Sequence, residues 1–269
     1  MVKQVGAVAG SSGLGSNGGK LHIGIWHAAV FLAFILIWWG LSATAGHGFL
    51  PSPRQTFNAA IRMSGDGTLA RAVIESLISL VCGFALAVVV AIPAGMAMGG
   101  VATVGAVLNP YVDALSSMPR IAFLPLIIVF LGLGYEAKIF MVFLGAVMPI
   151  LINTYAGVRN CDAELIEMAQ SAGAGNADIF RKIILPGALP HIMTGLRVGA
   201  SLALINTVVA ELYTAVSGLG GLLSIYGNSF RMAPYFVVVV ILAVIGMILM
   251  YAVRLLERSV TRWRIERPW

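Results

Sequence analysis

The sequence predicts an all-α, polytopic membrane protein with about six transmembrane helices. Two features of its composition support this fold class: hydrophobic residues make up 59% of the 269 residues, and charged residues make up only 10%. Soluble domains carry roughly 25% charged residues, so this chain cannot cover an ordinary soluble surface. The third observation is a series of apolar runs that reach about 20 residues, the length of a membrane-spanning helix.

Six apolar runs follow a polar, Gly/Ser-rich leader at residues 1–20, which we expect to be disordered. The first run is longer than the core of a signal peptide, and no convincing cleavage site follows it, so we expect an uncleaved helix. The third run is interrupted by Pro110, Pro119 and Pro125. The six runs cover residues 23–45, 73–98, 101–133, 139–158, 192–216 and 234–256.

The basic residues predict how the chain is oriented. Five arginines lie between residues 254 and 267. A second basic group lies in the loop after the fourth run and consists of Arg159, Arg181 and Lys182. Because loops rich in Lys and Arg stay in the cytoplasm, both termini are expected inside, with a single span in residues 101–133. Three arginines of the first outer loop do not fit this rule: Arg54, Arg62 and Arg71.

The expected organisation has three parts. A disordered cytoplasmic N-terminus covers residues 1–20, a transmembrane domain covers 21–257 and includes a cytoplasmic loop at 159–191, and a basic cytoplasmic tail covers 258–269. The net charge of +6 does not indicate a nucleic-acid partner, because the basic residues gather at the chain end and in one loop.

No pattern of catalytic, metal-binding or cofactor-binding residues is present in the sequence. Cys82, Cys161 and the four histidines are scattered and have no ligand spacing. Residues 13–18 match the pattern G-x-G-x-x-G, but they precede a membrane span and do not lie in a βαβ unit. We therefore expect no cofactor bound by this chain, and any energy source must lie in another subunit.

The most informative segment is a polar interruption at residues 162–186, between the fourth and fifth runs. Asp162 is expected to cap a short helix, which breaks at Gly173 and Gly175. Asn176 is expected to cap a second short helix, and Pro186 to end it. The two helices would present a set of apolar anchors to a docking partner, namely Ile166, Met168, Ile179, Phe180 and Ile183. The alternative is an amphipathic loop that lies at the lipid headgroups.

The spacing E-x-A-x(3)-G-x(9)-I-x-L-P in this loop resembles the cytoplasmic coupling loop of permease subunits of bacterial ATP-binding-cassette (ABC) importers. The chain as a whole resembles the nitrate/sulfonate/taurine-type subfamily of the binding-protein-dependent transport permeases, with a type I importer fold. Similar segments lie at residues 50–53, 118–125, 130–134, 149–158, 186–197, 209–211 and 217–220. The resemblance implies that an ATPase is coupled through Glu167, Ala169, Gly173, Phe180, Ile183, Leu185 and Pro186.

The resemblance also implies a set of partners and a location. Two cytoplasmic ABC ATPase subunits would use ATP, a periplasmic or lipid-anchored substrate-binding protein would deliver the solute, and a second permease copy would complete a homodimer in the bacterial inner membrane, among its lipids. The chain itself would be a transport subunit and no enzyme. Glycines in and after the second run permit close helix contacts, which suits such pairing: Gly83, Gly95, Gly99, Gly100 and Gly105.

Polar residues within apolar runs are candidates for the translocation path: Glu211, Asn206, Arg120 and Met118. Arg120 would favour a small anionic solute, such as a sulfonate, nitrate, taurine or a carboxylate. Alternatively, Glu211 is a structural carboxylate that pairs with an arginine, and Arg120 extends to the membrane interface. The segment 217–221 is expected to form an outer turn that contacts the binding protein or gates the path.

A secondary transporter or channel is the alternative function class. Such a protein would carry broken half-helices at corresponding positions in its two halves, with carboxylates at the membrane midplane. The third run is broken by proline, but the sixth is an uninterrupted apolar helix, which favours the importer subunit. An intramembrane enzyme would need an acid–base or metal constellation within the spans, and the sequence shows none there.

Overall fold

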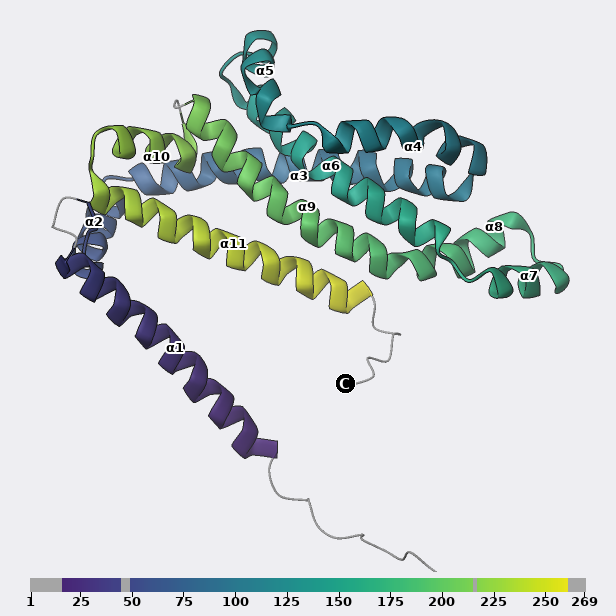
Figure 1. The fold of residues 1–269 in the computed structure, drawn as a ribbon, viewed down its shortest axis with the longest axis horizontal. Coiled ribbons are helices and arrows are strands. Elements are labelled where there is room, and N and C mark those ends of the chain that lie inside the picture. The colour runs from purple at the N-terminus through teal and green to yellow at the C-terminus, as the bar shows by residue number, and fades with distance from the viewer. Residues whose placement is uncertain (1–15, 45–48, 215–216, 261–269) are drawn as a thin grey trace, which may run out of the picture.

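The computed structural model describes residues 16–44, 49–214 and 217–260, and all regular elements in these ranges are helices (Figure 1). The predicted all-α class is therefore confirmed. Helix α1 begins at Ser16, inside the leader that was expected to be disordered. The elements are α1 (Ser16–Thr44), α2 (Pro53–Gly65), α3 (Thr68–Gly100), α4 (Ala102–Ser117), the 3-10 turn η1 (Arg120–Phe123), α5 (Leu124–Leu131), α6 (Tyr135–Arg159), α7 (Ala163–Ser171), α8 (Asn176–Ile179), the π turn η2 (Phe180–Ile184), α9 (Leu185–Thr214), α10 (Gly218–Asn228) and α11 (Met232–Val260).

Within the described ranges, four helical segments are long and apolar enough to cross a membrane: α3, α6, α11 and the continuous segment Asn176–Thr214. A fifth is possible if α4 and residues 120–131, which meet at an angle of 82°, count as one bent span. The bend follows from Pro119, because the residue before a proline is pushed into an extended conformation, and Met118 has φ −74° and ψ 137°. Residues Ala28–Thr44 of α1 form a shorter apolar segment that does not count among these spans, so the described ranges hold four or five of the about six spans that were expected.

The core of the bundle is formed by α3, α6 and α9, which lie side by side in Figure 1. Glycines on α3 face α6. A Cβ on Gly83 would lie 2.6 Å from Val142 Cβ, and one on Gly95 would lie 2.7 Å from Thr154 Cβ. These glycines permit close packing within one chain, so the expectation that they suit pairing with a second copy is wrong for Gly83 and Gly95.

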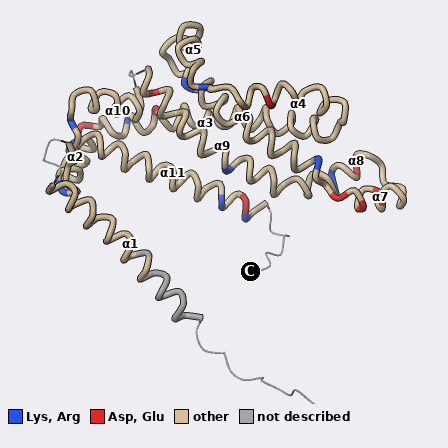
Figure 2. Tube along the Cα trace, in the orientation of Figure 1, with Lys and Arg blue, Asp and Glu red and all other residues tan. Residues whose placement is uncertain are grey.

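The bundle has two ends with different elements, and most charged residues lie near them (Figure 2). The first, here the α10 end, carries α2, α10 and the beginnings of α3 and α11; the second, the α7 end, carries α7 and α8 (Figure 1). The arginines that did not fit the orientation rule lie at the α10 end, two on α2 and one in the first turn of α3. Helix α2 begins with a capping box formed by Ser52 and Gln55.

Helix α1 is joined to the bundle through its C-terminal part. The indole Nε1 of Trp38 donates to the Pro51 carbonyl oxygen at 3.0 Å, and its ring stacks on Phe236 of α11 at 5.9 Å. The Ser42 hydroxyl donates to the Leu50 carbonyl oxygen at 3.0 Å. Large apolar side chains earlier in α1 are exposed, such as Trp26 and Phe31, as expected for a helix surrounded by lipid.

Candidate coupling loop and translocation path

The loop at the α7 end begins as the sequence predicts. Asp162 is the N-cap of α7, and its Oδ1 accepts a hydrogen bond from the Glu164 backbone N–H at 3.0 Å. The helix ends before Gly173, which has φ +81°. Only glycine adopts this left-handed conformation without strain, so Gly173 is a specific requirement of the turn between α7 and α8.

The second half of the loop differs from the prediction in two ways. The N-cap of α8 is Gly175, and Asn176 is the first residue of the helix. Pro186 does not end this helix, because α8, η2 and α9 form one continuous segment. In the π turn the Leu185 backbone N–H bonds to the Phe180 carbonyl oxygen, five residues back. This wider turn directly precedes Pro186. Proline has no N–H to donate to a helix, and we infer that the π turn allows the helix to continue through it.

The predicted anchors differ in exposure. Met168 is 66% exposed, whereas Ile179 is only 4% exposed and belongs to the interior of this chain. Ile179 is therefore not available as an anchor. Leu165 was not predicted, but it is 47% exposed on α7, and its one-turn spacing from Met168 could have identified it. Phe180 lies 4.0 Å from the position of a Cβ on Gly100, at the end of α3.

The remaining coupling residues lie on the outer side of the loop or at its junction with α9. Glu167 is exposed, and the nearby Lys182 pairs with Asp178 at 2.8 Å. Half-buried positions are occupied by Ala169, Ile183, Leu185 and Pro186. The segment that carries Phe180 and Ile183 continues without a break to Thr214.

Two of the four path candidates, Arg120 and Asn206, meet at Gly145 of α6. Arg120 Nη1 donates to the Gly145 carbonyl oxygen at 3.2 Å. Asn206 of α9 lies against the same glycine, since a Cβ on Gly145 would lie 2.7 Å from Asn206 Cγ. Met118 and Arg120 line a cavity of about 510 Å³ whose other walls are apolar. These walls come from α4, η1, α5 and α6: Leu115, Phe123, Leu126, Ile127, Phe130, Leu131, Phe140, Leu144 and Met148.

Glu211, the fourth candidate, does not line this cavity. It has no exposed surface, and its Oε2 accepts hydrogen bonds from the Ser76 hydroxyl at 2.7 Å and from the Gly220 backbone N–H at 2.9 Å. The expectation that Glu211 pairs with an arginine is therefore wrong, because its carboxylate accepts hydrogen bonds from a serine hydroxyl and a backbone amide. Among the described residues, Oε1 has no hydrogen-bond partner.

The segment 217–221 is not an outer turn. Ser217 is the N-cap of α10, and the four residues after it form the first turn of that helix and are buried. Lys138 of α6, which the sequence reasoning did not select, is 1% exposed and donates to the Ser217 carbonyl oxygen at 3.4 Å. Its position directly before the fourth apolar run made it look like the end of a span.

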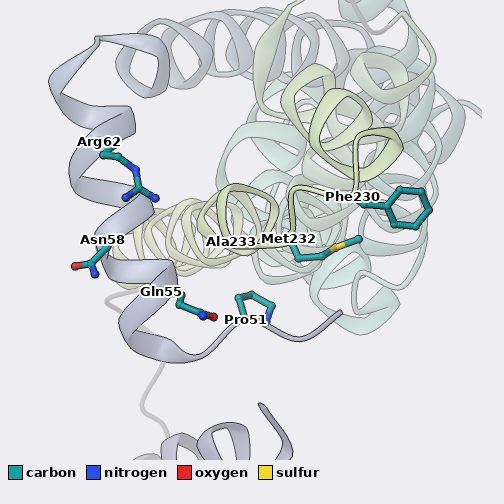
Figure 3. Close-up of a pocket in the computed structure, with 7 residues that line it drawn as sticks. All are labelled: Pro51, Gln55, Asn58, Arg62, Phe230, Met232 and Ala233. Atoms are coloured by element: carbon teal, nitrogen blue, oxygen red, sulfur yellow. The ribbon is translucent and has the colours of Figure 1, made fainter. Parts of the chain in front are cut away.

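A smaller cavity of about 350 Å³ opens at the α10 end, between α2 and the turn that precedes α11 (Figure 3). Gln55, Asn58 and Arg62 of α2 line one side, and Phe230 and Met232 line the other. Phe230 is 70% exposed and has φ +52°, which is unusual for a bulky residue.

The family described as "Binding-protein-dependent transport system inner membrane component" matches residues 87–262. The taurine transport system permease protein TauC of Escherichia coli (strain K12) is 33% identical over 243 residues, which cover 87% of this chain and 88% of TauC. The riboflavin transport system permease protein RibX of Chloroflexus aurantiacus is also 33% identical, over 87% of this chain and 88% of RibX.

A solved structure has the same fold. A chain of the MetNI methionine ABC transporter, in an inward-facing conformation, matches with a TM-score of 0.63 at 23% identity, covering 72% of this chain and 96% of that chain. Together with the family match over residues 87–262, the conclusion is that this chain belongs to the family of binding-protein-dependent transport system inner membrane components, the multi-pass permease subunits of ABC importers.

Proposed function

We propose that this permease carries a small anionic solute across the inner membrane and is driven by a separate ATPase that docks on residues 163–186. The observation that carries the proposal is the exposed α7 together with the continuous helical segment Asn176–Thr214. A short helix that is packed onto a partner moves as a unit, and a continuous helix transmits this movement into the membrane domain. ATP is used in the partner, and this chain binds no cofactor.

The docking contact is made by α7 and the turn after it. Leu165 and Met168 supply exposed apolar area, as expected for a helix that lies in a groove of its partner. Glu167 is exposed beside them and can pair with a basic residue of the ATPase. Gly173 sets the direction of the chain between α7 and α8, and Ile183, Leu185 and Pro186 join the loop to α9.

The orientation follows from this contact. An ATPase dock at the α7 end places that end, both termini and the tail at 258–269 in the cytoplasm, and it places the α10 end outside. Arg159, Arg181 and Lys182 support this orientation because Lys and Arg gather in cytoplasmic loops. The substrate-binding protein then docks at the α10 end.

The solute class rests on Arg120. TauC and RibX are equally identical to this chain, and their names state taurine and riboflavin, so identity alone does not decide between an anionic sulfonate head and a flavin. The guanidinium of Arg120 is a cation, and it lies in a cavity with otherwise apolar walls, which Met118 also lines. A cation in such surroundings favours a compact anion with an apolar or zwitterionic body, which fits taurine and other sulfonates, nitrate and carboxylates.

The complete importer is proposed to hold two copies of this permease and two ATPase subunits, surrounded by lipid. Helix α5 projects from the side of the bundle (Figure 1), and its Val129 and Phe130 are 79% and 77% exposed. A second copy that packs against this side would cover α5 and close the cavity of Arg120, so that the path lies between the two permeases.

Uptake by the reconstituted importer tests this proposal. The permease, its ATPase and its binding protein are placed in proteoliposomes, and uptake of radiolabelled taurine is measured with and without ATP. Arg120→Leu is expected to reduce uptake by roughly tenfold or more, since a hydrogen bond to a charged group contributes about 1.5–3 kcal/mol, whereas Arg120→Lys retains part of it. Arg254→Gln, on the exposed face of α11, is the matched control. Wild-type uptake by Arg120→Leu would contradict the role of Arg120.

A further inference from the structure

The N-terminus of α10 is capped by side chains of two other helices, α3 and α9. The first N–H groups of any helix have no partner within it, and the side chain of the N-cap Ser217 makes no capping bond here. Three successive amides donate instead to α3 and α9. The acceptors are Glu75 Oε2 for the amide of residue 218 at 2.9 Å, Ser76 Oγ for that of 219 at 2.8 Å, and Glu211 Oε2 for that of 220 at 2.9 Å.

Two of the three acceptors are themselves linked by a hydrogen bond. The Ser76 hydroxyl donates to Glu211 Oε2 at 2.7 Å while its oxygen accepts from the amide of residue 219. Gly218 has φ +84°, and a Cβ there would overlap the Glu211 carboxylate. A Cβ on Gly220 would lie 2.6 Å from Glu211 Cβ. Glycine is thus required at both positions for α10 to approach α9 this closely.

A buried cation lies on the other side of the same helix terminus. Lys138 of α6 is 1% exposed and donates to the hydroxyl and the carbonyl oxygen of Ser217. Side chains of α3, α6 and α9 therefore converge on one helix terminus. A cavity of about 330 Å³ lies beside it and is lined in part by Glu75, Ser217 and Gly218.

Glu211 also lies on the helical segment that carries the coupling residues. The segment Asn176–Thr214 is continuous, and at about 1.5 Å per residue it places Glu211 roughly 48 Å from Ile179. Its beginning belongs to the loop at the α7 end, and its end holds α10. A movement of the loop along or around this segment necessarily reaches the carboxylate.

We propose that Glu211 and Ser76 are positioning residues that hold α10 against α3, and that they pass movement of the coupling loop to α10 at the opposite end of the bundle. We call Glu75, Ser76, Glu211 and the amides of residues 218–220 the α10 latch. The latch is closed in this structure and opens when the ATPase changes state. Glu211 therefore acts on transport through α10 and does not touch the solute. This inference rests on the proposed function, namely that an ATPase docks at residues 163–186.

A buried polar network is an expensive way to fix a helix if fixing is its only task. Replacing such groups with apolar residues of similar volume is often neutral or stabilising, whereas removing one partner leaves uncompensated polar groups. Opening of the latch exposes the Gly218 to Gly220 amides and Glu211 to water that enters beside the 330 Å³ cavity, so water replaces their hydrogen-bond partners in the open state. This property suits an element that alternates between two positions.

The test uses the whole importer in lipid nanodiscs, with Cys82 and Cys161 replaced by serine and a reporter cysteine at Leu222→Cys. Leu222 is half-buried on α10 and lines the cavity beside the latch. The rate of labelling by a polar maleimide is measured without nucleotide and after trapping with ATP and vanadate. In the wild-type latch the two rates differ. In Glu211→Ala the nucleotide-free rate rises roughly tenfold, the effect of losing a hydrogen bond to a charged group, and the difference between the states disappears.

Four comparisons separate positioning from mere structural support. Glu211→Gln keeps an acceptor oxygen and restores the slow nucleotide-free rate, and Ser76→Ala reproduces the effect of Glu211→Ala if the latter fails to assemble. A reporter at Ser229→Cys, exposed after α10, labels at one rate throughout. ATP hydrolysis by the wild-type complex rises on addition of the binding protein, and this response is lost in Glu211→Ala.

The outcomes also distinguish the latch from the proposed function. If the wild-type complex contains no ATPase or shows no response to the binding protein, the proposed function fails. If the wild type responds and Glu211→Ala and Ser76→Ala, both assembled, keep the wild-type labelling rates and the same response, the importer stands and the latch is overturned.

Discussion

Gly99 of α3 lies so close to Val158 of α6 that a Cβ on the glycine would stand 2.6 Å from the valine Cβ. The adjacent Gly100 is different, because its nearest neighbour, Phe180, would be 4.0 Å away. Two consecutive glycines at the end of one helix thus have opposite surroundings, and only the first is required by the packing of α3 on α6.

This contrast predicts the effect of adding one methyl group. Gly99→Ala is expected to force α3 and α6 apart and to destabilise the protein by about 1–3 kcal/mol, the usual cost of overpacking. Gly100→Ala has room for its methyl group and gains helix propensity, so it is expected to be neutral or slightly stabilising. Thermal unfolding of the two variants in the same detergent measures the difference, and equal midpoints would contradict the packing argument.

The turn at Gly173 predicts a graded effect on coupling. Gly173→Val is expected to abolish ATP-driven uptake while the protein still inserts into the membrane, since a β-branched residue does not tolerate φ +81°. Gly173→Asn is expected to retain a substantial part of the activity, because asparagine adopts the left-handed conformation more readily. No atom lies within 4 Å of a Cβ at this position, so a loss of function would report the backbone and not a clash. Comparable uptake by Gly173→Val and the parent would remove Gly173 from the coupling mechanism.

The orientation can be checked by labelling from each side of the membrane. A cysteine introduced as Glu164→Cys, on the exposed face of α7, is expected to react with a membrane-impermeant maleimide only when the cytoplasmic face is accessible. Ser229→Cys, at the opposite end of the bundle, is expected to react only from the outside. Labelling of position 164 in intact cells, from the outside, would reverse the topology.

The start of α3 predicts a dependence of stability on pH. Asp66 lies outside the spans, and the hydrogen bond from the Thr68 backbone N–H, 3.0 Å long, holds the pKa of Asp66 below its usual value of 3.8. Because the folded pKa is lowered, the ionised carboxylate stabilises the fold above the unfolded pKa, and this contribution is lost as the pH falls through the folded pKa. Asp66→Ala is therefore expected to unfold slightly earlier than the parent at neutral pH, with the gap closing in acid.

A pH series of thermal unfolding midpoints measures this gap. Asp66→Asn, which keeps an acceptor oxygen, serves as the control and is expected to lose less stability and to show no closing gap. A gap of constant size down to the lowest pH would show that the charge of Asp66 plays no part.

The local features of the fold could be predicted from the sequence because they depend on neighbouring residues. The cap by Asp162 and the break at Gly173 follow from side-chain and backbone preferences within a few positions. The same local rules failed at Pro186, where a π turn just upstream lets the helix continue. A π turn has no sequence signature as strong as a proline, so the wrong prediction was the natural one.

Contacts between distant segments could not be predicted in the same way. The sequence showed that Glu211 was an unusual carboxylate within an apolar run, but its partner Ser76 lies 135 positions earlier. The sequence also showed that α3 carries small residues, and nothing in their spacing revealed whether they face the same chain or a second copy. Gly83 and Gly95 face α6 of the same chain, a result that required the packed structure.

The central claim is that an ATPase docks on the loop at residues 163–186, and co-purification from the native membrane tests it most directly. The tagged permease is extracted in mild detergent beside a variant in which Glu167 and Gly173 are both changed to tryptophan, and beside the control Gly65→Trp, whose site on α2 has no atom within 4 Å of a Cβ. We predict that an ABC ATPase subunit co-purifies with the native chain and the control and is lost from the double variant. Equal recovery of the ATPase with the folded double variant, or no ATPase with the folded native chain, would contradict the account.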